Sequence, residues 1–409
     1  MKPKMFLPFA VLSAVPFIMV LGNSMLIPVF PQMGAAMHLS QLQVGLLITL
    51  FSLPAGILIP FAGILSDHLG RKIVMAPALI IYGVGGLLAG AFAVLLSRPY
   101  VPILLARVLQ GMGAGGTYQL AMALTSDVFT SEERTKTLGY LEAANGLGKV
   151  LSPILGAALG LISWYAPFFA YGLLAIPIAL LVWFIVDEPQ DSQRHRQSLR
   201  EYWASLCGVF KEKASTLLAS YAAGAIGLFL LFGLLAFLSD RLESQFHVFG
   251  FAKGGVLAIP VGTMCLASFL GGYFLQSRQA WLKPAIVAGL AIITAGFALL
   301  PLCNASVILF VALSSVSALG IGLVLPPLNT LITSSTGPEE RGLVTCIYGT
   351  VRFFGVAAGP PAFGLVEKMN VTAMFWIAAG IAALGVAIAW LWIDPKKMTD
   401  TAQKEPTNP

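Results

Sequence analysis

Charged side chains are scarce in this chain. Lysine, arginine, aspartate and glutamate together make up 10% of its 409 residues, and the mean hydropathy is +0.86. Because charged residues make up about 25% of an average soluble domain, this composition excludes an ordinary soluble fold. Cysteine is also rare. The four cysteines stand apart, without a CxxC pair or the spacing of metal ligands, and predict neither a disulfide nor a metal site.

Long apolar runs take the place of the missing charge. A helix of ~20 such residues crosses a hydrocarbon core of about 30 Å. The runs are continuous rather than alternating in short segments, which favours helices over a transmembrane barrel. We therefore expect an all-α membrane protein with twelve transmembrane helices, over residues 8–30, 42–63, 73–96, 101–126, 138–161, 166–186, 215–239, 254–275, 283–302, 306–332, 342–365 and 371–393.

The basic residues indicate an orientation. With the N-terminus inside, 17 of the 24 lysines and arginines fall on the cytoplasmic side, four fall outside and three lie within spans. Cytoplasmic loops of membrane proteins carry such an excess, so the net charge of +6 indicates membrane topology rather than nucleic-acid binding. Lys2 and Lys4 precede an apolar run that reaches Phe30, too long for a cleaved signal peptide. Both termini are predicted to be cytoplasmic, in a bacterial-type inner (plasma) membrane.

An internal repeat divides the chain. Glu132-Glu133-Arg134 recurs as Glu339-Glu340-Arg341, at an offset of 207 residues. The same offset pairs Gly113 with Gly320, Gly115 with Gly322, Gly148 with Gly355, and Pro153 with Pro360. Duplicated halves are typical of alternating-access transporters, whose substrate site lies near the membrane midplane. We expect six-helix bundles at 1–186 and 215–393, joined by a cytoplasmic linker at 187–214 and followed by a tail at 394–409.

A short polar turn stands between the second and third spans. It reads Gly63-Ile-Leu-Ser-Asp67-His-Leu-Gly70-Arg71-Lys72. Such a turn brings Asp67 to a helix end and leaves the basic pair at the headgroups, where an ion pair or a helix-dipole contact can form and break. The stretch resembles motif A of the major facilitator superfamily, GxxxDxxGRK, with His68 where an Arg is usual. The resemblance implies that Asp67 and Arg71 stabilise the outward-facing state. Asp127, at the end of span four, is expected to be a further gate residue.

Three more stretches resemble the twelve-span drug/H⁺ antiporters of that superfamily. Leu21-Gly22 with Pro28-Val29-Phe30-Pro31 resembles the motif of span one, and the stretch beginning Arg107-Val-Leu-Gln110-Gly111 resembles motif B, whose arginine is implicated in proton coupling. Motif C, which implies export, is matched by Gly139, Gly148, Ser152, Pro153 and Gly156, with Ser152 and Ala157 in place of glycines. Small residues permit close helix contact and Pro153 can kink the helix, which fits either a sliding gate or a packing seam.

The few charges within the predicted spans are unequal in sign. At ~1.5 Å per residue, Lys149 and Arg352 lie near the midplane, one in each half. Arg107 is a third cation, and Glu142 is the single carboxylate. Since an unpaired buried cation is costly, we expect Lys149 and Arg352, together with Asn23, to contact an anionic or zwitterionic substrate. Lys149 could instead be a neutral amine or pair with a carboxylate.

Proton coupling is expected at Glu142 and Arg107. Span one contains Asn23 and no acidic residue, although many drug/H⁺ antiporters carry one there. Glu142 could alternatively do no more than reach the cytoplasmic interface.

These features predict a proton-coupled secondary active exporter of small amphiphilic molecules. It is expected to work as a monomer in the lipid bilayer, without a cofactor. The alternative is an exporter dedicated to one endogenous anionic metabolite, such as a siderophore or a lipid-linked head group. An intramembrane enzyme would need paired acids, a nucleophile with a histidine, or metal ligands within the spans, and none of the four histidines falls there. The sequence also leaves open a membrane sensor that transports no solute.

Overall fold

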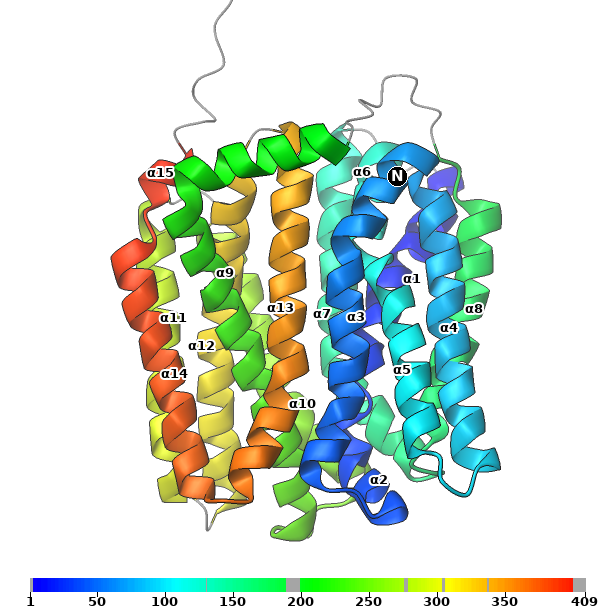
Figure 1. The fold of residues 1–409 in the computed structure, drawn as a ribbon, viewed down its shortest axis with the longest axis vertical. Coiled ribbons are helices and arrows are strands. Elements are labelled where there is room, and N and C mark those ends of the chain that lie inside the picture. The colour runs from blue at the N-terminus through cyan, green and yellow to red at the C-terminus, as the bar shows by residue number, and fades with distance from the viewer. Residues whose placement is uncertain are drawn as a thin grey trace, which may run out of the picture. The chain divides into compact units, whose positions relative to one another are not determined.

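A computed structural model describes residues 3–129, 131–188, 199–275, 279–303, 306–336 and 338–399. Within these ranges every regular element is an α-helix or a short 3-10 turn, and no strand occurs. The chain is therefore all-α, as its composition predicts (Figure 1).

The N-terminal half contains long helices joined by short turns. Its elements are α1 (Pro3–Ser24), η1 (Ile27–Val29), α2 (Phe30–Met37), α3 (Gln41–Leu69), α4 (Arg71–Leu95), α5 (Tyr100–Gly115), α6 (Tyr118–Val128), α7 (Ser131–Gly160) and α8 (Ala166–Ile185). The C-terminal half has α9 (Leu199–Ser244), α10 (Gly250–Leu275), η2 (Gln279–Trp281), α11 (Leu282–Leu299), η3 (Leu300–Cys303), α12 (Val307–Ser334), α13 (Pro338–Glu367), α14 (Val371–Trp392) and α15 (Pro395–Thr399). The Glu-Glu-Arg triplets occupy the first turns of α7 and α13.

Ten helical segments of the described chain are long and apolar enough to cross a membrane. The other two predicted spans, 101–126 and 138–161, coincide with the pair α5 and α6 and with α7. The helix breaks between α5 and α6 at Gly116 and Thr117, where the Thr117 hydroxyl donates to the carbonyl of Ala114 at 2.7 Å. The total of twelve spans and the cytoplasmic termini remain predictions.

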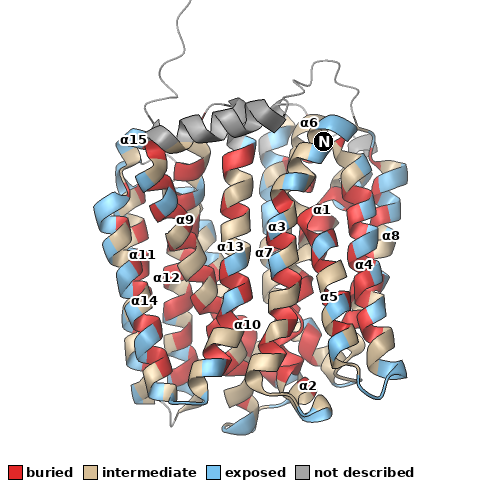
Figure 2. Cartoon of the chain, in the orientation of Figure 1, coloured by how far each residue is buried: buried red, intermediate tan, exposed pale blue. Residues whose placement is uncertain are grey.

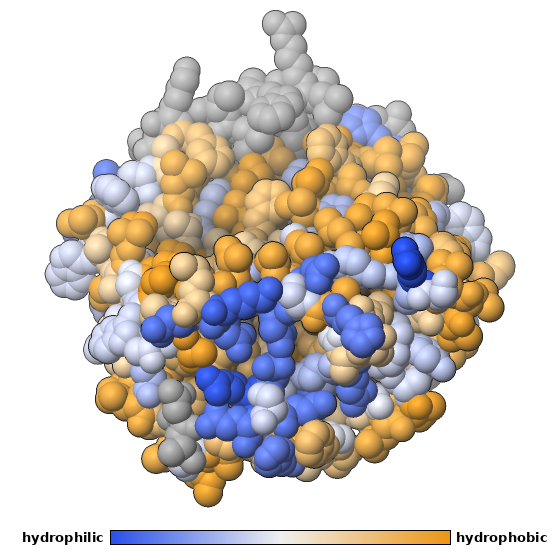
Figure 3. Space-filling view, turned by 60° about the horizontal axis from the view of Figure 1, so that its bottom comes forward, coloured by the Kyte–Doolittle hydropathy of each residue, from blue (hydrophilic) through white to orange (hydrophobic). Residues whose placement is uncertain are grey.

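Large apolar side chains are exposed along the helices. Leu105, Phe269 and Trp390 expose 66%, 71% and 64% of their surface, whereas buried residues line the inner faces of the helices (Figure 2). Hydrophilic residues gather on the end that Figure 3 brings forward, and hydrophobic residues surround them. Exposed apolar surface of this extent is typical of a protein in contact with lipid.

Contacts divide the chain into two compact units. The first comprises Met1–Arg196 and Leu235–Ala258, and the second comprises Gln197–Leu234 and Ile259–Pro409. The segment Leu235–Ala258 comes from the C-terminal half of the sequence but packs with the N-terminal helices. The Ser239 hydroxyl donates to the Ile27 carbonyl at 2.6 Å, for example. The predicted limits of the bundles, the linker and the tail stay predictions; residues 189–198 and 400–409 lie outside the described chain.

The duplicated glycines make equivalent contacts in both units. A side chain at Gly113 would overlap the backbone of α4, and one at Gly115 would overlap the backbone of α3. In the second unit, Gly320 lies against the α11 backbone and Gly322 against the α10 backbone in the same way. Because α3 and α10, like α4 and α11, hold the same places in the two halves, these contacts support a duplicated architecture.

Candidate functional site

The polar turn of motif A joins α3 to α4 at Gly70. This residue has φ of +112°, which favours glycine, and its amide donates to the Ser66 carbonyl at 2.9 Å. A Cβ atom at Gly70 would also lie 3.0 Å from a carboxylate oxygen of Glu188. Glycine therefore satisfies both the backbone conformation and the space at this turn.

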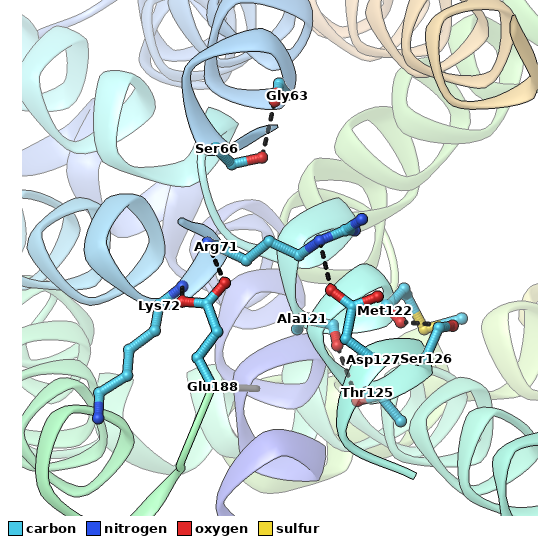
Figure 4. Close-up of polar contacts among 10 residues, drawn as sticks. All are labelled: Gly63, Ser66, Arg71, Lys72, Ala121, Met122, Thr125, Ser126, Asp127 and Glu188. Carbon is cyan, nitrogen blue, oxygen red and sulfur yellow. Dashed lines mark hydrogen bonds and ion pairs between the residues drawn. The ribbon is translucent and has the colours of Figure 1, made fainter. Parts of the chain in front are cut away.

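Glu188, which follows α8, caps the N-terminus of α4 (Figure 4). Its Oε1 accepts a hydrogen bond from the Arg71 amide at 2.7 Å, and its Oε2 accepts one from the Lys72 amide at 3.0 Å. Free amides and the helix dipole both favour a carboxylate at this end of a helix. Gly70 has no side chain to do this, so a distant segment supplies the cap. Glu188 falls in the predicted linker. In the sequence, its acidic charge directly after span six is the one feature that could have indicated a contact with the α3–α4 turn.

Arg71 forms an ion pair with Asp127, near the C-terminus of α6. The distance from Arg71 Nε to Asp127 Oδ2 is 2.7 Å, and the two side chains are 23% and 29% exposed (Figure 4). The structure thus brings together two residues predicted to belong to the gate. Because the pair is partly solvated, breaking it costs little free energy.

The other gate residues surround this pair less directly. Gly63 accepts a hydrogen bond on its carbonyl from the Ser66 hydroxyl at 2.7 Å. Asp67 lies half-buried in the last turn of α3. The Lys72 ammonium lies 5.9 Å from the ring centre of Trp183 in α8. Their gating role stays a prediction.

A second polar centre surrounds Arg107, which is completely buried in α5. Its Nε donates to the Leu47 carbonyl at 3.0 Å, its Nη1 to Gln110 Oε1 at 2.6 Å, and its Nη2 to Asn23 Oδ1 at 2.9 Å. The guanidinium carbon also lies 4.3 Å from the ring centre of Phe51. Neutral oxygens and an aromatic face therefore hold this cation. Gln110, within the quoted motif B stretch, is a partner that the sequence did not single out.

Asn23 is thus fixed beside Arg107 in the first unit. Its amide nitrogen donates to Ser52 Oγ at 2.7 Å, and only 6% of the residue is exposed. The predicted contact between Asn23 and a substrate stays a prediction.

Glu142 and Lys149 lie on α7 in different surroundings. Glu142 is exposed, and its carboxylate accepts a hydrogen bond from the Tyr118 hydroxyl in α6. Lys149, two turns further along α7, is half-buried. Asn145 lies between them and donates to the Pro16 carbonyl at 3.5 Å. A hydroxyl partner is compatible with proton exchange at Glu142, which stays a prediction.

The residues of motif C fit α7 against α1. A Cβ atom at Gly148 would lie 3.1 Å from the Phe17 carbonyl oxygen, and one at Gly156 would overlap the Met25 carbonyl oxygen. Ser152 and Pro153 are buried between these contacts, whereas a Cβ atom at Gly139 would meet nothing within 4 Å. Gly148 therefore permits a close approach of α7 to α1, and Gly156 permits a close approach of α7 to the turn that directly follows α1.

Arg352 is half-buried near the middle of α13, in the second unit. Its guanidinium carbon lies 5.2 Å from the ring centre of Tyr348, which stacks on Tyr221 of α9 at 5.8 Å and 22°. The Tyr221 hydroxyl donates to the Val344 carbonyl at 3.0 Å. The sequence analysis did not predict these tyrosines as site residues. Tyr348 stands four residues before Arg352 on an apolar helix, and this spacing could have indicated that the two share a face.

The described residues contain no group of three or more histidine, cysteine, aspartate or glutamate side chains that could hold a metal ion. The site residues instead form separate centres at the α3–α4 turn, around Arg107, along α7, and on α13. Such an arrangement offers charges that can change partners, together with cations inside apolar helices.

Comparisons with known proteins agree with this description. The family model described as Major Facilitator Superfamily matches residues 12–360. The chain is 38% identical over 388 residues to the bacillibactin exporter of Bacillus subtilis (strain 168), covering 94% of this chain and 96% of the relative. It is 25% identical over 373 residues to the quinolone resistance protein NorA of Staphylococcus aureus (strain MRSA252), covering 91% and 93%.

A solved structure shares the fold. The bacterial homolog of the human lysosomal transporter Spinster, in an inward-facing and occupied conformation, superposes with a TM-score of 0.77 at 17% identity. The match covers 99% of this chain and 100% of that one. With the family model spanning most of the sequence and a relative at 38% identity over nearly its whole length, the chain belongs to the Major Facilitator Superfamily of multi-pass membrane transporters.

Proposed function

We propose that this protein is a proton-coupled secondary active exporter of small amphiphilic molecules that carry an anionic or zwitterionic group. The observation that carries the direction of transport is the match, over 94% of the chain, to a relative named as an exporter. NorA, named for quinolone resistance, is a second relative matched over most of the chain.

The contacts of α7 support the export mechanism. Gly148 lets α7 approach the α1 backbone, and Gly156 lets it approach the backbone of Met25 directly after α1. Helices that touch through small residues can slide without steric conflict between side chains. The Arg71–Asp127 pair, partly open to solvent, is a suitable contact to break in one conformation and form in the other.

Charge supports an anionic or zwitterionic substrate. Arg107 is held by neutral partners, and Nε of Arg352 has no hydrogen-bond partner within the described residues. A cation in apolar surroundings is stabilised by an anion that reaches it. Lys149 is proposed to act with Arg352, each from its own half of the chain.

Proton coupling is proposed at Glu142. The carboxylate is exposed on α7, so protons can reach it, and the Tyr118 hydroxyl offers a partner in both protonation states. Arg107 is proposed to support the coupling from its buried position. We propose a monomer as the working unit.

A second candidate is an exporter dedicated to one endogenous anionic metabolite. Identity to the bacillibactin exporter is 38%, against 25% to the quinolone resistance protein, which favours a narrow substrate range. The two candidates share a mechanism and differ in specificity.

An efflux panel in cells tests both candidates. Cells that lack the protein and cells that overproduce it are loaded with bacillibactin, with other anionic metabolites, and with anionic and cationic drugs. Faster export of several anionic compounds supports the broad role, and export of a single compound supports the dedicated one. Collapse of the pH gradient should stop export in either case. Equal efflux from both cell types for every compound would reject the proposal.

A further inference from the structure

Three polar atoms on one face of α13 have no hydrogen-bond partner among the described residues. They are Oγ1 of Thr345, the hydroxyl oxygen of Tyr348 and Nε of Arg352. The residues are spaced three and four apart, which places them on the same side of a helix. We call Thr345, Tyr348 and Arg352 the α13 donor face. Among the described residues of the second unit, only Thr336 adds a further buried side-chain atom of this kind.

Such a cluster is unusual in a folded protein. Buried polar side chains nearly always have a partner, and leaving one unpaired costs free energy. Tyr348 is 2% exposed, whereas Thr345 and Arg352 are half-buried. Thr345 and Arg352 therefore keep part of their surface exposed, while the unpaired polar atoms themselves are buried.

The surrounding packing holds the donor face in position. Tyr221 stacks on the Tyr348 ring and is itself anchored through its hydroxyl to the Val344 carbonyl. A Cβ atom at Gly224 would lie 2.6 Å from the Tyr348 ring, so glycine on α9 makes room for that ring. The Tyr348 ring is consequently held in place, and the Arg352 guanidinium carbon lies 5.2 Å from its centre.

The N-terminal half of the chain, which repeats the C-terminal half, has no equivalent of the donor-face hydroxyls at the matching positions. At the offset of 207 residues, Thr345, Tyr348 and Arg352 correspond to Leu138, Leu141 and Asn145 in α7. Leu141 is completely buried, so the equivalent helix packs with apolar side chains at two of the three positions. The hydroxyls of the donor face are therefore not a requirement of the fold.

The chemistry of the donor face defines its ligand. An arginine Nε can only donate, and both hydroxyls can donate as well. No protein acceptor reaches Nε of Arg352 among the described residues. A group that accepts several hydrogen bonds and carries negative charge is the type of ligand that suits these donors.

We propose that the α13 donor face is a subsite that binds the oxyanion of the transported molecule. Carboxylates, phosphates and phenolates all carry such an oxyanion. This assignment rests on the proposed export function and specifies its substrate class. Arg352 supplies the charge, and the hydroxyls of Thr345 and Tyr348 orient the oxyanion.

Binding to the purified full-length protein tests the subsite. The probes are a carboxyl-bearing rhodamine and its methyl ester, which differ only in the anion. Tyr348→Phe and Thr345→Val each remove one hydroxyl and keep the shape of the side chain. Each should weaken binding of the carboxyl probe roughly tenfold or more, as expected for a hydrogen bond to a charged group. Binding of the methyl ester should be unchanged.

Stability distinguishes this role from a structural one. Because the Tyr348 hydroxyl has no hydrogen-bond partner among the residues that the structure describes, Tyr348→Phe should leave the melting temperature unchanged or raise it. Tyr221→Phe is the matched control, since it removes a hydroxyl bonded to the backbone and should lower the melting temperature without selective loss of the carboxyl probe. Equal binding of both probes by all variants, or equal loss of both probes, would overturn the subsite.

Competition identifies the type of oxyanion. An alkyl carboxylate, an alkyl phosphate and a phenol are each added to the protein with the carboxyl probe bound. The compound that displaces the probe most strongly identifies the class of oxyanion that the subsite prefers. Displacement by none of them contradicts the proposal. Efflux of the carboxyl probe from vesicles separates the two hypotheses. If the wild-type protein binds this probe selectively but exports no compound of the panel, the export function is wrong. If export occurs while the variants lose no selectivity, the subsite is wrong.

Discussion

The guanidinium of Arg107 donates from Nη2 to Asn23 Oδ1 at 2.9 Å, and it does so with no surface exposed to solvent. The Leu47 carbonyl and Gln110 complete its set of neutral partners. Removal of one partner leaves part of a buried charge unsatisfied.

Asn23→Ala should therefore lower the free energy of unfolding by about 1.5–3 kcal/mol, the value of a hydrogen bond to a charged group. Asn23→Asp keeps the acceptor and adds an opposite charge, so it should retain stability. Unfolding of the purified protein in detergent measures both. Asn145→Ala is the control, because that amide donates to a neutral carbonyl at 3.5 Å and its loss should cost less. A wild-type melting curve for Asn23→Ala would contradict the role of Asn23.

Gly156→Ala should impair folding strongly, because the added methyl group would overlap the Met25 carbonyl oxygen and force α7 away from the turn that directly follows α1. Gly139→Ala lies in the same helix, where nothing approaches within 4 Å, and should be neutral or stabilising by up to about 1 kcal/mol through helix propensity. Yield of monodisperse protein and its melting temperature report the difference. Similar behaviour of the two variants would mean that α7 does not pack on this turn in this way.

Arg71→Ala and Asp127→Ala should slow transport while changing stability by no more than about 1 kcal/mol, because the ion pair is partly exposed. The double exchange Arg71→Asp with Asp127→Arg should recover part of the transport rate. Initial rates of efflux from vesicles provide the measurement. If the double variant is less active than either single variant, the Arg71–Asp127 ion pair does not determine the transport rate.

Glu188→Ala should destabilise the start of α4 by about 0.5–2 kcal/mol, the range measured for helix caps. The carboxylate accepts from two backbone amides there, so Glu188→Gln, which keeps one acceptor oxygen, should be milder. Hydrogen exchange of the Arg71 and Lys72 amides detects the loss directly. Unchanged protection of these amides in Glu188→Ala would exclude the cap.

Glu142→Gln should abolish pH-driven export and leave substrate binding intact, since the amide cannot carry a proton. Tyr118→Phe removes only the hydroxyl that donates to this carboxylate and leaves the carboxylate in place, so it should retain pH-driven export. Proton release on substrate addition, measured with a pH-sensitive dye, follows both variants. Full coupled transport by Glu142→Gln would remove Glu142 from the mechanism.

The sequence by itself determined the class of this protein. Continuous apolar runs can satisfy their backbone groups in lipid only as helices, and the motif around Gly63 and Arg71 is contiguous in the chain, so both features are local. The duplicated glycines Gly113 and Gly320 were also visible, because a fixed offset does not depend on folding.

Partners distant in the sequence were decided only by the tertiary structure. Glu188 lies 117 residues from Arg71, and Asn23 lies 84 residues from Arg107, so no local pattern joins them. On α13, spacing put Tyr348 and Arg352 on one face, but only the packed helices showed that Tyr348 stacks on Tyr221 and that the Tyr348 hydroxyl and Arg352 Nε have no hydrogen-bond partner within the described part of the chain.

Lys253 illustrates the same limit at the end of a helix. The sequence places it just outside a predicted span, yet it is 2% exposed and pairs with Glu243 at 2.8 Å, because α10 begins at Gly250 and turns this side chain inward. Depth along a helix follows from counting residues, whereas the neighbours of a side chain depend on how separate helices meet.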